Sequence, residues 1–220
     1  MNTHTRVRGR RLARALAATS LAGLAAAAAA PTAVSAPAGS DTISVNAQRH
    51  VLNGQRVRIA GTLGSGQANR TVVVRVRHGG DWRTVDRVKT TKGGNYAAVW
   101  TPRGLARYGV RVGTADGSAK RSLTDGVTVY RRSAASWYGP GFYGNRTACG
   151  RTLGRGTLGV AHKSLPCGTK VTLRYRGRTV VAPVIDRGPY AGNREYDLTA
   201  ATKQRLGFGS TGTVWSSPQR

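Results

Sequence analysis

The stretch from Val180 to Asp197 reads Val-Val-Ala-Pro-Val-Ile-Asp-Arg-Gly-Pro-Tyr-Ala-Gly-Asn-Arg-Glu-Tyr-Asp, and it decides the fold of the C-terminal part of the chain. The segment from Arg178 to Ile185 is nearly all apolar, which predicts a β-strand that is buried on both faces. Asp186 comes where that strand ends, and Arg187-Gly188-Pro189 turns the chain directly after it. The sequence therefore predicts a carboxylate that is held by a rigid strand at the open rim of a β-structure.

The same stretch reverses the charge of the rest of the chain. Asp186, Glu195 and Asp197 are three of only eight acidic residues, against 35 Lys and Arg and a net charge of +27. Glu195 and Asp197 lie two residues apart, so their side chains share one side if the segment is extended. This concentration of carboxylates marks the stretch as the candidate for acid–base chemistry.

Regular elements are predicted on both sides of this stretch. Lys170 to Tyr175 alternates apolar and polar residues, which predicts a strand that Arg176-Gly177 turns back into the apolar one. Thr199 is expected to cap a short helix over Ala200 to Leu206, which Gly207 ends.

Residues 1–36 have the pattern of a cleaved signal peptide. Five arginines between Arg6 and Arg14 form a positive start, an Ala/Leu run follows to about Ala30, and Val34-Ser35-Ala36 supplies a cleavage site. A membrane anchor is the alternative, but Pro31 interrupts a run that is only weakly hydrophobic. We therefore expect a secreted, extracellular or wall-associated monomer without a membrane anchor after cleavage. Export favours anionic cell-wall polymers over nucleic acid as the counterpart of the positive charge.

A linker at 37–40 leads into a region, 41–132, that is rich in short alternating segments. Gly, Asn and Asp separate these segments, and no helical period is present, which predicts an immunoglobulin-like β-sandwich. No group of chemically active residues stands out, so a spacer or adhesion role is expected. The predicted strands are Thr42 to Val45, Arg56 to Ala60, Thr71 to Val76, Trp82 to Val88, Tyr96 to Trp100, Tyr108 to Val112 and Val127 to Tyr130.

The chain has two cysteines, Cys149 and Cys167. In an exported protein two cysteines are expected to pair, and this bridge would stabilise a small domain by about 3 kcal/mol. A cysteine nucleophile with His162 nearby in sequence is the competing interpretation, which an oxidising location disfavours.

Five motifs then occur in order, and together they resemble the rare lipoprotein A (RlpA) family of double-psi β-barrels, which is related to expansins. The resemblance covers residues 134–216 and none of the sandwich, so we place the barrel domain at 133–217. The motifs are Ala-Ser-Trp-Tyr-Gly at 135–139, Arg-Thr-Ala-Cys-Gly at 146–150, Val-Ala-His-Lys-Ser-Leu-Pro-Cys-Gly-Thr-Lys-Val at 160–171, Val-Ile-Asp-Arg-Gly-Pro-Tyr at 184–190 and Tyr-Asp-Leu-Thr at 196–199.

The resemblance implies a mainly-β protein whose six-stranded barrel carries a groove for a polysaccharide. It implies lytic transglycosylation of peptidoglycan glycan strands, in which the MurNAc–GlcNAc bond is cleaved with a 1,6-anhydro product. Asp186, His162 and Asp197 match the catalytic positions of the family motifs. The family's Glu after the Thr-Ala-x-Gly turn is replaced by Arg151.

Our hypothesis gives Asp186 both proton transfers, with Asp197 tuning or orienting it and His162 binding substrate or relaying the proton. Simpler roles remain open: Asp186 as a turn cap, Asp197 as the start of the helix and His162 as a strand residue with its hydrogen bonds satisfied. The candidate substrate-binding residues are Trp137, Tyr138, Thr147, Arg187 and Glu195.

Two other functions compete with the enzyme. A non-catalytic, expansin-like protein that binds or loosens wall polysaccharide is favoured by Arg151, because losing an acid costs chemistry more than binding. Specific nucleic-acid binding fits the charge but not the export signal or the barrel motifs. Four scattered histidines and a paired set of cysteines predict no metal site, and no nucleotide or cofactor motif is present.

Overall fold

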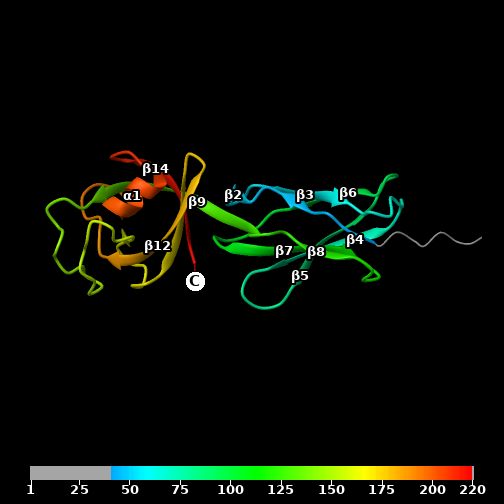
Figure 1. Ribbon diagram of the computed structural model, residues 1–220, viewed down its shortest axis with the longest axis horizontal. Coiled ribbons are helices and arrows are strands. Elements are labelled where there is room, and N and C mark those ends of the chain that lie inside the picture. Colours follow the sequence, from blue (N-terminus) through cyan, green and yellow to red (C-terminus); the bar gives the residue numbers. More distant parts are fainter. Residues whose placement is uncertain (1–40, 220) are drawn as a thin grey trace, which may run out of the picture. The chain divides into compact units, whose positions relative to one another are not determined.

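The computed structural model describes residues 41–219, which form fourteen β-strands and one α-helix (Figure 1). The predicted mainly-β class is confirmed. The predicted signal peptide, residues 1–36, and the linker, 37–40, lie outside the described residues and stay predictions.

The N-terminal strands form two sheets. One sheet has the order β1-β3-β6, and in the other β5, β4 and β7 lead to β9, with β8 paired to β7 and β2 paired to β9 (Figure 1). The strands are β1 (Asn46–Ala47), β2 (His50–Leu52), β3 (Val57–Thr62), β4 (Thr71–Arg77), β5 (Arg83–Lys89), β6 (Asn95–Trp100), β7 (Arg107–Thr114), β8 (Lys120–Ser122) and β9 (Val127–Tyr138).

The buried faces of these two sheets share one hydrophobic cluster. In β6 and β7 every second residue is buried, as alternating strands require when one face meets solvent. Ile59, Val72 and Val110 are among the fully buried members of the cluster. The immunoglobulin-like classification itself stays a prediction.

Two details differ from the predicted strands. The segment from Thr42 to Val45 is not a strand, because Ile43 makes only an isolated bridge to Leu63. Three further strands were not expected, because they are too short for alternation to show. They are β1 (Asn46–Ala47), β2 (His50–Leu52) and β8 (Lys120–Ser122).

Strand β9 is shared between the N-terminal sheet and the C-terminal strands. Its residues Val127 to Tyr130 pair with β7 and β2, whereas Arg131 to Tyr138 pair with β14 and β13. The boundary that we predict between residues 132 and 133 therefore falls inside a continuous strand.

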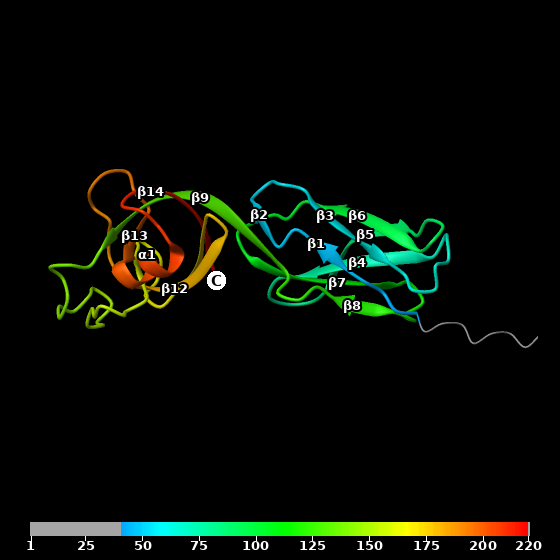
Figure 2. The same cartoon turned by 45° about the horizontal axis from the view of Figure 1, so that its top comes forward.

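The C-terminal strands close into a ring. These six strands pair in the order β13-β10-β12-β11-β14-β9. Strand β9 also pairs with β13, which closes the ring, so the sheet has no edge strand (Figure 2). A second hydrophobic cluster, including Val171, Leu173 and Leu198, fills this barrel. The elements are β10 (Val160–Ala161), β11 (Lys170–Tyr175), β12 (Arg178–Asp186), β13 (Tyr196–Thr199), α1 (Ala200–Leu206) and β14 (Gly212–Pro218).

The hairpin between β11 and β12 forms where the sequence predicted it. Arg176 and Gly177 both have positive φ, at 45° and 85°, as a two-residue hairpin turn of the primed type requires. The sequence predicted that β12 is buried on both faces, and this prediction is wrong for the first half of the strand. Val181 is 48% exposed, whereas Ala182 and Val184 point into the barrel.

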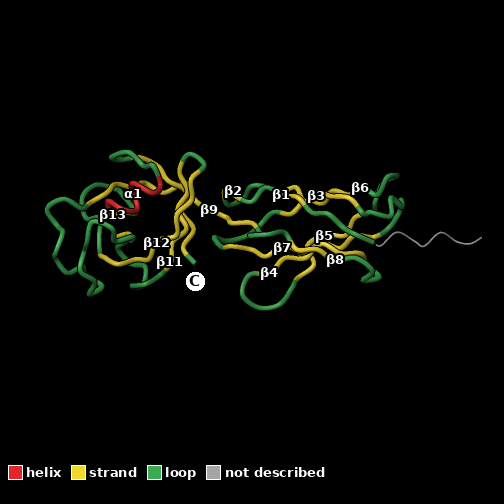
Figure 3. Tube along the Cα trace, viewed as in Figure 1, coloured by secondary structure: helices red, strands yellow, loops and turns green. Residues whose placement is uncertain are grey.

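Helix α1 begins and ends as expected from its caps. The Thr199 hydroxyl accepts a hydrogen bond from the Thr202 N–H, and Gly207 ends the helix in the left-handed conformation. Leu206 and Thr202 face the barrel, and the helix lies beside β12 and β13 (Figure 3).

Candidate functional site in the barrel

A hollow of about 220 Å³ opens at the end of strand β12. Asp186 and Asp197 lie on its wall, on the two strands that flank β10, because Ala161 of β10 pairs with both of them. Two strand spacings separate their backbones by about 10 Å. The small side chain of Ala161 lies between them and leaves the space open. The lining is Tyr138, Phe142, Ala161, Asp186, Arg187, Gly188, Pro189, Tyr190, Ala191, Arg194 and Asp197.

The backbone fixes the carboxylate of Asp186. Its Oδ1 accepts hydrogen bonds of 2.9 Å from the N–H groups of Ala148 and Arg187. Such bonds from backbone donors stabilise a negative charge and hold it in one orientation. Asp186 is therefore held in one orientation at the edge of the hollow.

Asp197 has the opposite environment. Burial raises its pKa, and the charge of Asp186 acts in the same direction, while a 2.8 Å hydrogen bond from Ser136 Oγ and the charge of Arg194 act against it. The protonated form of Asp197 is therefore favoured relative to an exposed aspartate. The two carboxyl groups of the hollow therefore have different surroundings: backbone donors hold Asp186, and burial surrounds Asp197.

Tyr138 lines the same hollow. Its hydroxyl oxygen is buried and has no hydrogen-bond partner in the part of the chain that the structure describes. Burial raises the pKa of Tyr138, and the charges of Asp186 and Asp197 raise it further, so the phenol stays protonated. The hydroxyl therefore lies close to the two carboxyl groups of the hollow.

Two exposed aromatic residues flank the hollow, and the sequence did not single them out. Phe142 is 54% exposed and packs edge-on against Tyr138, while Tyr190 is 80% exposed. Tyr190 directly follows the Gly188-Pro189 turn, and Phe142 lies between Gly141 and Tyr143. Local sequence offers no signal for them, because Phe208 also stands between glycines and yet is buried in the barrel core.

His162 lies in a separate hollow of about 410 Å³, together with Glu195 and Arg131. Its Nε2 is 3.6 Å from Glu195 Oε1, and Glu195 is ion-paired with Arg131. Because His162 directly follows Ala161 at the end of a strand, its side chain points to the opposite side. The structure therefore brings neither His162 nor Glu195 into the hollow that holds Asp186.

The His162 ring is held as a neutral group. Its Nδ1 accepts hydrogen bonds from the N–H groups of Ser164 and Leu165, at 3.1 and 3.0 Å. Burial is the main cause that lowers the pKa of His162, and the charge of Glu195 opposes it. With Nδ1 accepting, the proton of the neutral ring lies on Nε2, which faces Glu195.

Three other positions of interest lie away from the hollow. Lys203 Nζ lies 3.7 Å from the centre of the Trp137 ring, which packs against the barrel core. Thr147 is buried, and its Oγ1 accepts a hydrogen bond from the N–H of Arg151 across a turn. Arg151 is exposed on that turn. None of the three lines the space beside Asp186.

Arg187 lines the hollow and braces its surroundings. Its guanidinium donates to the carbonyl oxygens of His162 and Leu165, at 3.2 and 2.9 Å, and to Cys167 Sγ. The predicted disulfide between Cys149 and Cys167 is present. It ties the loop that supplies the Ala148 N–H to the loop that Arg187 holds.

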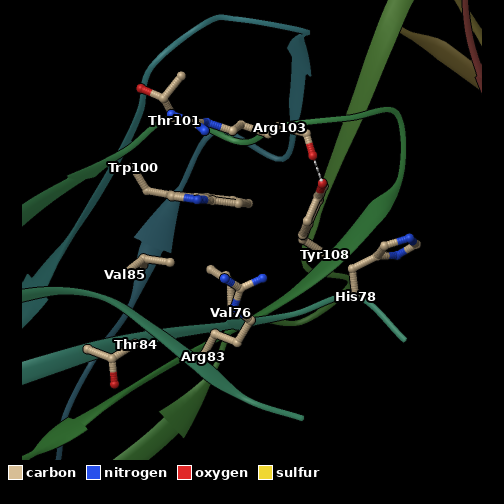
Figure 4. A pocket seen from close by; sticks show the side chains of 9 residues that line it. All are labelled: Val76, His78, Arg83, Thr84, Val85, Trp100, Thr101, Arg103 and Tyr108. Carbon is tan, nitrogen blue, oxygen red and sulfur yellow. Dashed lines mark hydrogen bonds between the residues drawn. The ribbon is translucent and has the colours of Figure 1, made fainter. Parts of the chain in front are cut away.

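A larger hollow, of about 450 Å³, lies among the N-terminal strands (Figure 4). Trp100 and Tyr108 form its aromatic wall, with their rings edge to face at 5.0 Å, and the Tyr108 hydroxyl donates to the Arg103 carbonyl. His78 and Arg83 also line it. The lining contains no carboxylate, so the acid pair of the barrel has no equivalent here.

Within residues 41–219, no three His, Cys, Asp or Glu side chains gather closely enough to hold a metal ion. The same residues contain no helix with the length and apolar character that crossing a membrane requires.

The closed ring of six strands, with its core and its rim hollow, is a double-psi β-barrel domain. Residues 131–215 match the family model described as lytic transglycolase. This part of the chain belongs to the RlpA-like double-psi β-barrel family.

Several curated relatives are similar to this chain. A probable endolytic peptidoglycan transglycosylase RlpA from Synechocystis is 39% identical over 132 residues, which are 59% of this chain and 39% of that protein. The endolytic peptidoglycan transglycosylases RlpA of Campylobacter jejuni and Neisseria meningitidis are 43% and 42% identical over 82 residues, 36% of this chain. Those matches span 30% and 34% of the two relatives, so the chain covers about a third of the length of these proteins.

Proposed function

We propose that this protein is a secreted lytic transglycosylase that cleaves the glycan strands of peptidoglycan at the MurNAc–GlcNAc bond. The observation that carries the proposal is the pair Asp186 and Asp197, which share one open hollow in unlike environments. The match to a family described as lytic transglycolase, and to relatives named peptidoglycan transglycosylases, supports the substrate.

In the proposed reaction the two carboxyl groups divide the proton transfers. Asp197, whose protonated form is favoured by burial, donates its proton to the glycosidic oxygen as the bond to C1 breaks. Asp186, oriented by two N–H donors, takes the proton of the sugar's C6 hydroxyl as O6 bonds to C1. The products are a 1,6-anhydro end and a free 4-hydroxyl, and no water is consumed.

This division differs from our sequence hypothesis, which gave both transfers to Asp186. The burial of Asp197 supports the change, because a general acid needs a pKa closer to the working pH than an exposed aspartate has. After each turnover Asp186 loses its proton to solvent and Asp197 regains one.

Aromatic residues supply the contacts to the sugar in this proposal. Phe142 and Tyr190 offer exposed faces on which pyranose rings can stack, and the Tyr138 hydroxyl donates to a sugar oxygen. His162, with Glu195, would act outside the reacting centre, on a neighbouring part of the glycan.

Mass spectrometry of peptide-stripped peptidoglycan incubated with the protein tests the proposal. We expect 1,6-anhydro ends with the parent protein and a loss of at least about a hundredfold in Asp186→Asn and Asp197→Asn, the usual size of an acid–base contribution. Asp81→Asn, an exposed turn position of the N-terminal part, is the matched control and should keep full activity. Parent activity in either barrel variant would refute the assignment.

A non-catalytic wall-binding function is the second candidate. Arg151, on the turn where the family has Glu, favours it. The same incubation separates the two functions, because a binding protein would sediment with the glycan and leave no 1,6-anhydro ends.

A further inference from the structure

One outer surface of the N-terminal part carries an unusual set of cations. Residues directly opposite each other in paired strands share a face, and the pairings place Arg75 across from Arg111 and align Arg87 with Val73, Gly113 and Lys120. Arg77 lies two residues beyond Arg75 on the same side. We call this surface, made by Arg75, Arg77, Arg87, Arg111 and Lys120 on strands β4, β5, β7 and β8, the cationic face.

The cationic face has no internal compensation. Among the described residues, none of its five cations has a carboxylate oxygen within 4.0 Å. Asp86, which precedes Arg87 on β5, accepts hydrogen bonds from the backbone N–H groups of Arg87 and Val99. Asp116 is ion-paired with Arg70.

Like charges stand directly opposite each other on this face. Arg75 and Arg111 are Cα partners in antiparallel strands, an arrangement that destabilises a sheet unless a counter-charge is present. A solvated surface could avoid this cost with any neutral side chain. An external anion beside these two strands would relieve this repulsion.

The surface between these cations is hollowed. Gly113 stands beside Val73 and Lys120, and a Cβ at this position would lie 2.9 Å from the Ala119 carbonyl oxygen. The result is a hollow of about 190 Å³ whose lining includes Arg75, Arg111 and Lys120 and contains no carboxylate. Three cations around one small hollow suit a single phosphate group.

Two arginine side chains already cover the ring of Trp82, the aromatic residue beside the cationic face. The guanidinium carbons of Arg77 and Arg111 lie 5.0 and 4.0 Å from the centre of the Trp82 ring, which also packs on Gly109. A nucleic acid that binds through stacked bases needs an open aromatic face. This surface offers cations for phosphates without a platform for bases.

We propose that the cationic face binds an anionic cell-wall polymer of the polyol-phosphate type, with one phosphate seated in the hollow between Arg75, Arg111 and Lys120. Neighbouring strands lie about 4.8 Å apart and alternate residues about 6.8 Å apart, so the five cations cover a strip about 14 Å wide on which successive phosphates can lie. This site goes beyond the proposed glycan cleavage, because it contains no residue of the barrel hollow. Its role would be to hold the enzyme at the wall.

Binding of the purified protein to poly(glycerol phosphate) tests this site across about 50 to 200 mM salt. Arg75→Gln/Lys120→Gln removes two cations of the hollow and leaves the Trp82 contacts in place. We expect affinity to fall about tenfold at the lowest salt, and the slope of log affinity against log salt to fall by about 0.7, the value for one phosphate that is no longer neutralised. Arg56→Gln/Arg58→Gln, which removes two exposed cations beside and on β3 of the other sheet, is the matched control.

An equal loss in both double variants would overturn the proposal, because the effect would then be net charge alone. Unchanged binding by Arg75→Gln/Lys120→Gln would overturn it too, as would tighter binding of single-stranded DNA with the same number of phosphates. Thermal unfolding excludes misfolding, since removing Arg75 relieves the repulsion with Arg111 and should not lower the melting temperature. Release of 1,6-anhydro ends from soluble, phosphate-free glycan should stay at the parent level, so that failure of this site is distinguishable from failure of the catalytic proposal.

Discussion

The backbone N–H of Ala148 lies 2.9 Å from Oδ1 of Asp186, and the residue after Ala148 is bridged to Cys167. The position of a donor to the candidate base is thus tied to a covalent cross-link. Arg187 strengthens this connection, because it holds the loop that carries Cys167.

Loss of the disulfide should affect stability and activity together. We expect Cys149→Ser/Cys167→Ser to lower the free energy of unfolding by about 3 kcal/mol, the chain-entropy value for a loop of this size. Activity of the molecules that remain folded should also fall, because the Ala148 donor is no longer fixed. Urea unfolding and glycan cleavage on the same samples measure both effects, and full activity in the folded fraction would contradict the positioning role.

Asp197→Asn should change how stability depends on pH. The folded-state pKa of Asp197 is raised, so this group contributes stability that is fully present below the unfolded pKa and is lost as pH rises through the folded pKa. An asparagine accepts the Ser136 hydrogen bond without carrying a charge. We expect the variant to gain stability relative to the parent as pH rises from acid to neutral, with Asp186→Asn as the comparison. Parallel unfolding curves at all pH values would contradict the raised pKa.

Tyr138→Phe should separate function from stability. The hydroxyl is buried without a hydrogen-bond partner among the described residues, so its removal should raise the free energy of unfolding by about 1 kcal/mol. Glycan cleavage should nevertheless fall about tenfold, the effect of losing one hydrogen bond to bound substrate. A variant that is destabilised and fully active would show that the hydroxyl has an internal partner instead.

Tyr190→Ala should weaken binding alone. Tyr190 is 80% exposed, so its truncation should change stability by less than about 0.5 kcal/mol. Loss of one stacking contact, worth about 1 kcal/mol, should raise KM about fivefold with little change in kcat. Trp137→Ala is the contrasting variant, and its loss of packing against the core should appear as reduced stability.

The fold was predictable where local chemistry specifies it. Thr199 and Gly207 set the ends of α1, and Arg176-Gly177 sets the β11–β12 hairpin, because caps and tight turns need particular residues. The exposure of Val181 was not predictable, because an apolar run does not reveal which of its two faces a neighbouring element covers.

The site was predictable only in part, since it depends on which strands become neighbours. Asp186 and Asp197 lie on the two strands that flank Ala161. The spacing of residues along the chain does not reveal this pairing of strands. The separation of His162 from them follows from the alternation of side chains, which requires knowing that Val160–Ala161 is a strand of two residues. Phe142 arrives from a loop whose path local sequence does not specify.

Strand β9 limits how this protein can be divided or recombined. Arg131 and Arg132 pair with Ser216 and Trp215 of the barrel, while Val127 and Thr128, a few residues earlier, pair with β7. A gene fragment that starts at the apparent domain junction would remove two rungs from the β9–β14 seam and leave the edge of β14 open. The barrel therefore includes two residues on the sandwich side of the predicted boundary, and a fragment that keeps the whole seam has to begin no later than Arg131.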